Sequence, residues 1–296
     1  MLVSIVIRTL NEGEYLGKLL KQISKQRKDN FNIEVVIVDS GSTDDTLKIA
    51  NSYNSKVTFI DKQNFTFGRS LNIGSAYANG EILVYVSGHC IPTDENWIIK
   101  LIDPIRKKTS GYTYGGQLGV DITKYSEKQI FKKYFPNERK DPQEGFFCNN
   151  ANSAIKESVW RKLKFDETLT GLEDMELAKR YTDLNGKISY ISDASVFHIH
   201  DESYSQIKRR FEREALALRH IMPEVNVGLI DVLKYIFSSI FLDFKEALYE
   251  KVFLREILSI VKYRSSQYLG TYIGNRIQRK ISKKKKDSYF YPSNKS

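Results

Sequence analysis

Residues 33–46, IEVVIVDSGSTDDT, are the stretch from which the fold can be worked out. The run Val35–Val38 shows no alternation of apolar and polar residues, which is typical of a strand buried on both faces of a sheet. The run ends at Asp39, and a polar turn and a helix start at 44–46 follow. Because open α/β sheets bind ligands at the carboxyl ends of their strands, we expect Asp39 to lie at a ligand site.

The same unit occurs once before, at the start of the chain. Residues 2–7 read as a strand, residues 8–13 as a polar turn, and residues 14–25 as a helix with apolar residues at helical spacing. Two such units in succession predict a parallel βαβ arrangement. The first strand is not followed by GxGxxG, so the usual dinucleotide fingerprint is missing.

The rest of the chain continues this alternation and then changes character. We expect strands at 57–60, 82–86, 115–120, 188–191 and 195–198, and helices at 70–78, 97–105 and 173–185. Residues 65–69 read as a loop, and residues 121–144 as a variable loop with a helix. Residues 149–159 lead into a further helix that ends near Lys162. Residues 225–262 read as mostly helical, with an apolar stripe formed by Leu229, Val232, Leu233, Ile236, Phe237, Ile240 and Phe241. The sequence therefore predicts an α/β domain over 1–222 and a helical extension over 223–296.

Composition narrows the class of protein. The 296 residues are 41% hydrophobic and 28% charged, as in ordinary folded soluble proteins, and the net charge of +10 favours an anionic partner. Two cysteines, Cys90 and Cys148, argue against a disulfide framework and fit a reducing cytosol. Because Met1 runs directly into a strand, we expect no signal peptide. No stretch reaches the ~20 apolar residues of a transmembrane helix.

The polar turns supply the first candidate ligand-binding groups. Thr9, Asn11 and Glu12 follow one strand, and Asp39 and Ser40 follow the next. Their acidic and amide groups suit the N–H and hydroxyl groups of a base and a ribose. The alternative is that such residues cap the helices that begin there, which we expect for Asp44 and Asp45.

Five segments, in order, carry a resemblance to a known family. They are VSIVIRTLNEGEYLGKLLKQI, IEVVIVDSGSTDDT, FGRSLNIGSAYANGEILVYVSGHCIPTDENW, FFCNNANSAIKESVWRKLKFDETLTGLEDMELAKRY and ISDASVFHIH. Together they cover roughly residues 2–211 and resemble family 2 glycosyltransferases, most closely bacterial rhamnosyltransferase-type enzymes of surface polysaccharide assembly. The resemblance implies the GT-A fold, a mixed and mainly parallel sheet flanked by helices.

The resemblance also implies a nucleotide-sugar site. Thr9, Asn11 and Glu12 would line the nucleoside pocket, and Asp39, with Ser40 beside it, would contact a pyrimidine base. A further pair, Arg69 and Asn72, matches the family's loop and helix beside the nucleotide, although Arg69 also fits a surface salt bridge.

One motif departs from the family. Where relatives carry Asp-x-Asp, whose last carboxylate reaches a divalent metal on the diphosphate, this chain has Ser87-Gly88-His89. His89 could ligate Mn²⁺ or Zn²⁺ more readily than Mg²⁺. Alternatively the metal is lost and Lys, Arg or backbone groups stabilise the phosphates, or His89 is a hydrogen-bonded pocket residue. A divalent cofactor, Mn²⁺ or Mg²⁺, is therefore an open expectation.

A second histidine motif follows at His198-Ile199-His200. On a strand, residues two apart point to one face, so the two imidazoles form a plausible metal or diphosphate site. The resemblance favours His200 as the ligand. The alternative is a pair of strand-end histidines satisfied by Asp193 or Asp201.

The catalytic candidates lie at Glu173-Asp174. The resemblance implies that Asp174 acts as general base of an inverting reaction, with Glu173 positioning the acceptor. Acids at a helix start are favoured in any case by the helix dipole. For the acceptor sugar we expect Asn150 and Asn152, with Trp160 either stacking on it or belonging to the core.

These features together predict an inverting enzyme that moves a sugar from a UDP or dTDP sugar to a glycan or polyprenyl-linked acceptor. The alternatives are a metal-independent transferase using a nucleoside monophosphate sugar, and a non-catalytic binding protein that kept the fold. The basic, aromatic-flanked segment 279–286 favours an anionic membrane surface, hence a cytoplasmic, peripheral location at the cell membrane. The C-terminal helices could instead form a homodimer. Nucleic acid is not expected, because no recognised module accompanies the charge.

Overall fold

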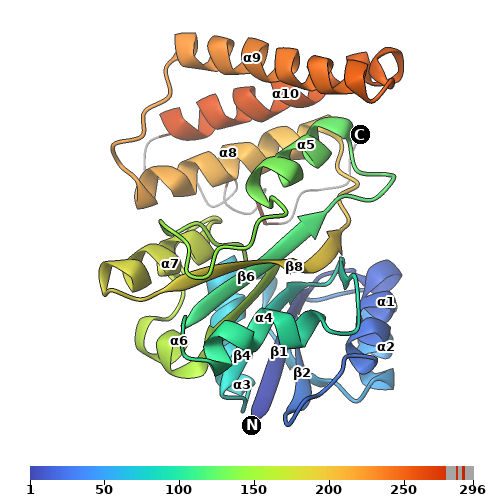
Figure 1. Cartoon of the computed structure of the whole chain (residues 1–296), viewed down its shortest axis with the longest axis vertical. Coiled ribbons are helices and arrows are strands. Elements are labelled where there is room, and N and C mark those ends of the chain that lie inside the picture. Colours follow the sequence, from blue (N-terminus) through green and yellow to red (C-terminus); the bar gives the residue numbers. More distant parts are fainter. Residues whose placement is uncertain (278–284, 286–288, 291–296) are drawn as a thin grey trace. The chain divides into compact units, whose positions relative to one another are not determined.

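The computed structural model describes residues 1–277, 285, 289 and 290, which form two compact units (Figure 1). Unit 1 comprises 1–120, 134–168 and 173–199. Unit 2 comprises 121–133, 169–172 and the described residues from 200 onward. We expected a boundary at 222–223, whereas the units part near residue 200, because helix α8 (Tyr204–Ile221) packs along helix α10 (Phe253–Arg276).

Unit 1 is built on an eight-stranded sheet with the order β3-β2-β1-β4-β7-β6-β8-β5. The strands are β1 Leu2–Thr9, β2 Asn32–Asp39, β3 Lys56–Phe59, β4 Ile82–Ser87, β5 Cys90–Pro92, β6 Tyr112–Leu118, β7 Asn152–Lys156 and β8 Ile188–His198. The strands β3, β2, β1 and β4 are parallel, β7 runs antiparallel to both of its neighbours, β6 and β8 are parallel, and β5 is antiparallel to β8. This confirms the mixed, mainly parallel sheet.

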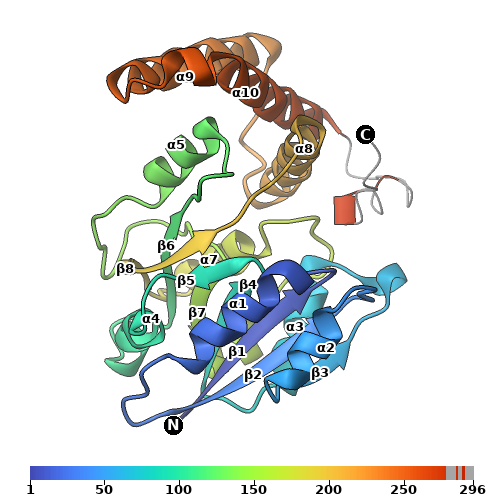
Figure 2. The same ribbon diagram turned by 90° about the vertical axis from the view of Figure 1, so that its right-hand side faces the viewer.

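Helices cover both faces of that sheet. They are α1 Gly13–Ser24, α2 Thr46–Ser52, α3 Phe67–Tyr77, α4 Trp97–Arg106, α6 Glu157–Leu163 and α7 Glu173–Asp183, with a 3₁₀ turn at Lys62–Asn64. Alternate residues of β1 divide between the faces. Ile5 packs in one core cluster with side chains of α1, α2 and α4, whereas Val6 faces Gly74 of α3 (Figure 2). Because β1 and β2 are parallel neighbours with Thr9 opposite Asp39, the loops that follow them meet at one edge of the sheet.

Several elements differ from the sequence prediction. Helix α3 begins at Phe67 rather than Ser70, because the Thr66 hydroxyl caps it by accepting from the Arg69 backbone N–H (3.0 Å). Residues 152–156 form strand β7, which was not expected, and they lead directly into helix α6, which ends near Lys162 as expected. The short strands expected at 188–191 and 195–198 form one continuous strand, β8. Its pairing with β6 shifts register between Gly115 and Gln117, and this irregularity lets the strand continue through its middle residues. Both cysteines are buried free thiols.

Unit 2 is helical in its described part, with α5 (Tyr125–Tyr134), α8, α9 (Leu229–Tyr249) and α10. Helix α10 approaches α8 closely at Gly270, where an added Cβ would lie 2.2 Å from the Lys208 carbonyl oxygen. A buried ion pair joins α9 to α10, with both guanidinium contacts between Arg264 and Asp243 at 2.7 Å. The predicted basic segment 279–286 lies outside the described residues, apart from Lys285.

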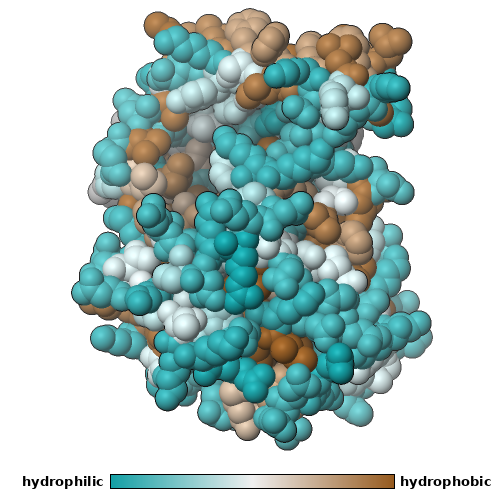
Figure 3. Space-filling model, viewed as in Figure 1, coloured by the Kyte–Doolittle hydropathy of each residue, from teal (hydrophilic) through white to brown (hydrophobic). Residues whose placement is uncertain are grey.

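The apolar stripe expected on residues 229–241 is mostly solvent-exposed within the described chain, and Figure 3 shows apolar side chains along α9 at the top of the view. Val232 is buried, whereas Leu229, Leu233, Phe237 and Phe241 are each between 46% and 69% exposed. Among the described helices, none combines the length and apolar character needed to cross a bilayer.

Candidate active site

The turns that follow β1 and β2 are tied together by reciprocal hydrogen bonds. The Asn11 side-chain oxygen accepts from the Thr43 backbone N–H (2.8 Å), and the Ser42 hydroxyl accepts from the Asn11 backbone N–H (2.9 Å). Asn11 adopts a left-handed backbone conformation (φ 55°), which asparagine tolerates. The Asp44 carboxylate bridges the turns by accepting from the Gly13 N–H (2.9 Å) and from Thr46. Asp44 thus connects two loops rather than only capping a helix.

Asp39 is buried in this arrangement, with 1% of its surface exposed. One carboxylate oxygen accepts from the Thr9 hydroxyl (3.1 Å) and the Ser42 hydroxyl, and the other accepts from the Gly41 and Ser42 backbone N–H groups (both 2.9 Å). The Ser40 hydroxyl donates to the Thr9 carbonyl (3.1 Å), which joins the ends of β1 and β2. Asp39 therefore organises the turn, and its contact with a base stays a prediction.

Two histidines stack at the end of β4 and β8, with His89 and His198 ring centroids 5.2 Å apart. The His89 Nδ1 lies 2.9 Å from a carboxylate oxygen of Glu12, and the His198 Nδ1 lies 2.7 Å from the Gln117 side-chain oxygen. Gly88 allows Glu12 to come this close, because a Cβ there would lie 2.9 Å from the Glu12 Cγ. The sequence did not point to Gln117 or to the pairing of His89 with Glu12.

This donor set fits a divalent metal. Because each Nδ1 faces an oxygen acceptor, a neutral ring at either position donates from Nδ1 and presents Nε2, which is the orientation in which imidazole ligates a metal. Imidazole nitrogens suit Mn²⁺ or Zn²⁺ better than Mg²⁺. His89 and His198 are therefore the unit 1 residues that would hold it, and the sequence had favoured His200 over His198.

His200 lies beyond the end of β8, so the strand-alternation argument does not apply to it. It belongs to unit 2, where its Nδ1 lies 2.7 Å from a carboxylate oxygen of Glu127. The Nδ1 partners of the two histidines are Gln117 and Glu127, whereas the alternative had named Asp193 or Asp201. Arg210 pairs with Glu127 (2.7 Å) and Glu202 (2.8 Å). The charges of these two carboxylates are therefore already compensated by a guanidinium. Metal ligation by His200 stays a prediction.

Asp174 lies at the first turn of α7 and is 8% exposed. Its carboxylate accepts from the backbone N–H groups of Asn150 and Met175, both at 2.8 Å. Burial, together with the charge of Glu173, raises the pKa of Asp174 to about 7, although these hydrogen bonds and Arg8 oppose the shift. A carboxyl group with this pKa is suited to accept a proton near neutral pH.

Arg8 is a site residue that sequence reasoning missed. It follows the buried part of β1, its guanidinium lies 3.4 Å from a Glu173 carboxylate oxygen, and it stacks over the Phe67 ring at 4.8 Å. A cation at the carboxyl end of the first strand was the signal that could have found it. Glu173 itself is buried beside Asp174 and has this cation as its partner.

Three predicted ligand-binding residues need correction. Trp160 is 2% exposed and belongs to the core, so it cannot stack on a sugar. Asn72 is 8% exposed. Its amide nitrogen donates to the Phe165 carbonyl and to Glu167, and its amide oxygen accepts from the Trp160 ring and the Phe165 backbone N–H. Asn152 is fully buried and bonds Trp97 and two backbone carbonyls. The polar atoms of both amides are thus engaged within the fold.

Two further predicted ligand-binding residues, Arg69 and Asn150, already make contacts within the protein with some of their polar atoms. Arg69 forms the salt bridge that was the alternative for it, with its Nε 2.7 Å from Glu167. The Asn150 side-chain oxygen accepts from the hydroxyls of Tyr112 and Ser153, both at 2.7 Å. Among the described residues, no hydrogen-bond partner meets the Asn150 amide nitrogen, which is itself buried, and a contact with the acceptor stays a prediction.

Comparison with known proteins points to one family. The family described as "Glycosyl transferase family 2" matches residues 4–164. The O-antigen chain rhamnosyltransferase RfbN of Salmonella typhimurium is 26% identical over 68% of this chain and 67% of its own length. The O-antigen chain rhamnosyltransferase WbaN of Salmonella anatum is 27% identical over 63% of this chain and 62% of its own length. The chain thus spans less than two thirds of the second relative.

Solved structures share the fold. The mannosyltransferase PcManGT of Pyrobaculum calidifontis, in complex with GDP-Man and Mn²⁺, gives a TM-score of 0.63 at 15% identity and covers 92% of this chain and 84% of its own. Residues 1–349 of S. aureus TarS give a TM-score of 0.53 at 21% identity and cover 92% of this chain and 90% of their own. At these identities the likeness concerns the fold alone.

Proposed function

Because the chain belongs to glycosyl transferase family 2, we propose that it transfers a sugar, with inversion, from a nucleotide-sugar donor to a glycan or lipid-linked acceptor in surface polysaccharide assembly. The observation that carries this proposal is the buried Asp174 carboxyl group, whose pKa is raised to about 7. Its placement between the Asn150 backbone and the start of α7 fixes the carboxylate oxygens against rotation.

The mechanism follows from that geometry. Deprotonated Asp174 takes the proton of the acceptor hydroxyl, and the acceptor oxygen attacks the sugar C1 from the face opposite the leaving nucleoside diphosphate. Arg8 keeps Glu173 paired, so that the neighbouring carboxylate contributes less repulsion when Asp174 is ionised. We assign the Asn150 side-chain nitrogen, on the residue whose backbone N–H bonds Asp174, as a donor to the acceptor.

The donor half of the site is assigned to the interlocked turns. A base and a ribose would bind at this edge of the sheet, as the fold class predicts. The amide, hydroxyl and carboxylate groups around it belong to Thr9, Asn11, Glu12, Asp39 and Ser40. A UDP or dTDP sugar is the proposed donor; the relatives named rhamnosyltransferases favour this choice. When bound at His89 and His198, a divalent ion would neutralise charge on the departing diphosphate.

We place the enzyme at the inner face of the cell membrane, where lipid-linked acceptors are made. Support comes from helix α9, on which exposed Phe237 and Phe241 lie among exposed Lys234 and Lys245. Apolar side chains interleaved with lysines are the pattern of helices that bind anionic bilayer surfaces.

Replacing Asp174 tests the proposal. Asp174→Asn cannot accept the proton, so we expect sugar transfer to fall by about 10²–10⁴-fold while donor binding persists. Transfer is measured with purified acceptor and radiolabelled nucleotide sugar, and donor binding by thermal shift. The matched control is Asp183→Asn, at the exposed end of the same helix. Full transfer by Asp174→Asn would refute the assignment of the base.

The replacement of Asp-x-Asp by Ser87-Gly88-His89 favours one second candidate, a metal-independent transferase that uses a nucleoside monophosphate sugar. Transfer that survives excess chelator and is unaffected by added Mn²⁺ supports it. If no nucleotide sugar binds or turns over, the chain is instead a binding protein that kept the fold.

A further inference from the structure

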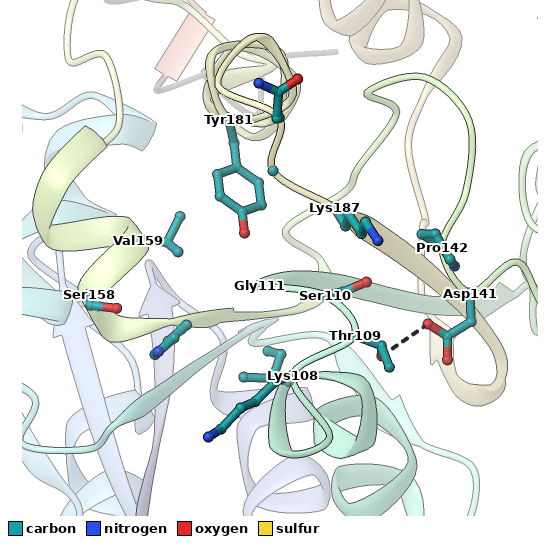
Figure 4. A pocket seen from close by; sticks show the side chains of 14 residues that line it. Lys108, Thr109, Ser110, Gly111, Asp141, Pro142, Ser158, Val159, Tyr181 and Lys187 are labelled. Carbon is teal, nitrogen blue, oxygen red and sulfur yellow. Dashed lines mark hydrogen bonds between the residues drawn. The ribbon is translucent and has the colours of Figure 1, made fainter.

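A pocket of about 650 Å³ lies in unit 1 at the sheet edge opposite the interlocked turns. Its walls come from the residues that precede β6 and β8, from the end of β7 and from the loop at Asp141–Pro142. Strands β6 and β8 run parallel to each other and begin here, whereas the candidate active site lies where β1, β2 and β4 end. The pocket, drawn in Figure 4, is thus separate from the site described above.

Three lysines line the pocket: Lys108, Lys156 and Lys187. Within the part of the chain that the structure describes, none of their ammonium groups takes part in an ion pair. They come from three separate segments that the fold brings together. Like charges gathered in one concavity repel one another, and an anion in their midst removes that repulsion.

The one acidic residue of the lining is already neutralised. Asp141 pairs with Arg139 (2.7 Å), accepts from the Ser189 hydroxyl (2.7 Å) and lies 3.4 Å from the Thr109 hydroxyl (Figure 4). Burial opposes ionisation of this group, but these contacts lower the pKa of Asp141, so it stays a paired carboxylate. The lysines therefore have no carboxylate of the lining left to pair with.

Two glycines keep the pocket open around Tyr181. A Cβ at Gly111 would lie 2.1 Å from the Tyr181 hydroxyl oxygen, and one at Gly186 would lie 2.4 Å from its ring. Figure 4 shows the hydroxyl pointing from α7 toward Gly111 and Ser110. The tyrosine and Ser158 add neutral hydrogen-bond donors beside the ammonium groups.

We propose that this lysine pocket binds a phosphate-bearing anion, independently of the nucleotide-sugar site. The ammonium groups supply point charges, the hydroxyls supply directional donors, and the volume suits a small phosphorylated ligand. The phosphate can come from a soluble compound or from a lipid headgroup, since both present the same anionic oxygens. The site would hold such a group on the far edge of the sheet from the reaction.

The test uses the full chain with saturating UDP and Mn²⁺, so that the nucleotide site is filled, and inorganic phosphate as the probe in calorimetric titration. The variant is Lys108→Gln/Lys156→Gln/Lys187→Gln. The control, Lys25→Gln/Lys28→Gln/Lys48→Gln, removes the same charge from exposed positions of the same unit. We expect binding to the wild type and the control, and affinity about ten-fold or more weaker in the pocket variant.

Vesicles of phosphatidylcholine with and without phosphatidylglycerol distinguish the sources. Loss of phosphatidylglycerol-dependent binding in the pocket variant alone identifies a headgroup ligand, and phosphate binding without vesicle binding identifies a soluble one. Equal phosphate affinity in the pocket variant and the control overturns the proposal, as does an absence of phosphate binding by the wild type. Because the nucleotide site is not used, these outcomes are independent of sugar transfer.

Discussion

At the residue scale, the two adjacent carboxyl groups at the start of α7 have different surroundings. Glu173 is paired with Arg8, whereas Asp174 is buried and accepts hydrogen bonds from two backbone N–H groups. Burial and the Glu173 charge raise the pKa of Asp174 to about 7. Since the base acts when deprotonated, we expect kcat/KM to rise with pH through about 7 and then level off. Initial rates between pH 5 and 9 check this, and Arg8→Gln should move the midpoint upward. A profile that is flat below pH 7 would contradict it.

A second residue-scale prediction concerns Glu127, which is 2% exposed. Burial alone would raise the pKa of Glu127, but Arg210 and His200 outweigh it and lower the pKa to about 2. The folded value lies below the unfolded value, so the stabilisation is fully present above pH ~4.5 and lost as pH falls toward 2.

Glu127→Gln should therefore lower the free energy of unfolding at pH 7 by about 3 kcal/mol, because it leaves Arg210 and His200 without their shared partner. Urea unfolding at several pH values measures this, and the difference from the wild type should shrink below pH 4.5. Exposed Glu224→Gln is the control. A difference that stays constant down to pH 2 would show that charge is not the cause.

At the element scale, helix α3 lies against the sheet at Gly74, where an added Cβ would be 2.5 Å from Val6 and 2.7 Å from Val38. Alanine is the better helix former, yet we expect Gly74→Ala to destabilise the fold by about 1–3 kcal/mol, because α3 must move off β1 and β2. In Gly17→Ala the new methyl meets only ordinary contact at 3.7 Å, so α1 should gain up to ~1 kcal/mol. Thermal unfolding of both variants compares them, and a stabilised Gly74→Ala would mean that α3 packs less closely.

On the scale of the whole molecule, charge and exposed apolar surface bear on the proposed membrane contact. The chain carries a net charge of +10, and the described part of α9 exposes Phe237 and Phe241, each 69%. We expect co-sedimentation with anionic vesicles that weakens with salt, and a loss of about ten-fold or more in Phe237→Ser/Phe241→Ser. Phe59→Ser/Leu184→Ser removes comparable exposed apolar surface from unit 1 and should bind as the wild type does. Equal binding by both double variants would rule out α9 as the contact.

How much of the site could be predicted depended on the kind of contact involved. Asp174 could be placed at a helix start from local sequence, because its setting lies within a few residues. The amides of Asn72 and Asn152 could not be distinguished from ligand-binding amides, since their partners are 36 to 95 residues away and appear only when α3, α4 and β6 are assembled. Trp160 was undecided for the same reason, because burial is a property of the packed core.

By itself, the sequence determined the alternation of strands and helices over the first hundred residues and the positions of the polar turns, because hydrophobic periodicity and turn chemistry act over short distances. Residues 33–46 accordingly form β2, its turn and the start of α2. Only the tertiary structure decided that Asp39 accepts a hydrogen bond from Thr9, that His89 stacks on His198, and that three distant lysines share a pocket. Those contacts join segments far apart in the chain, so no local pattern encodes them.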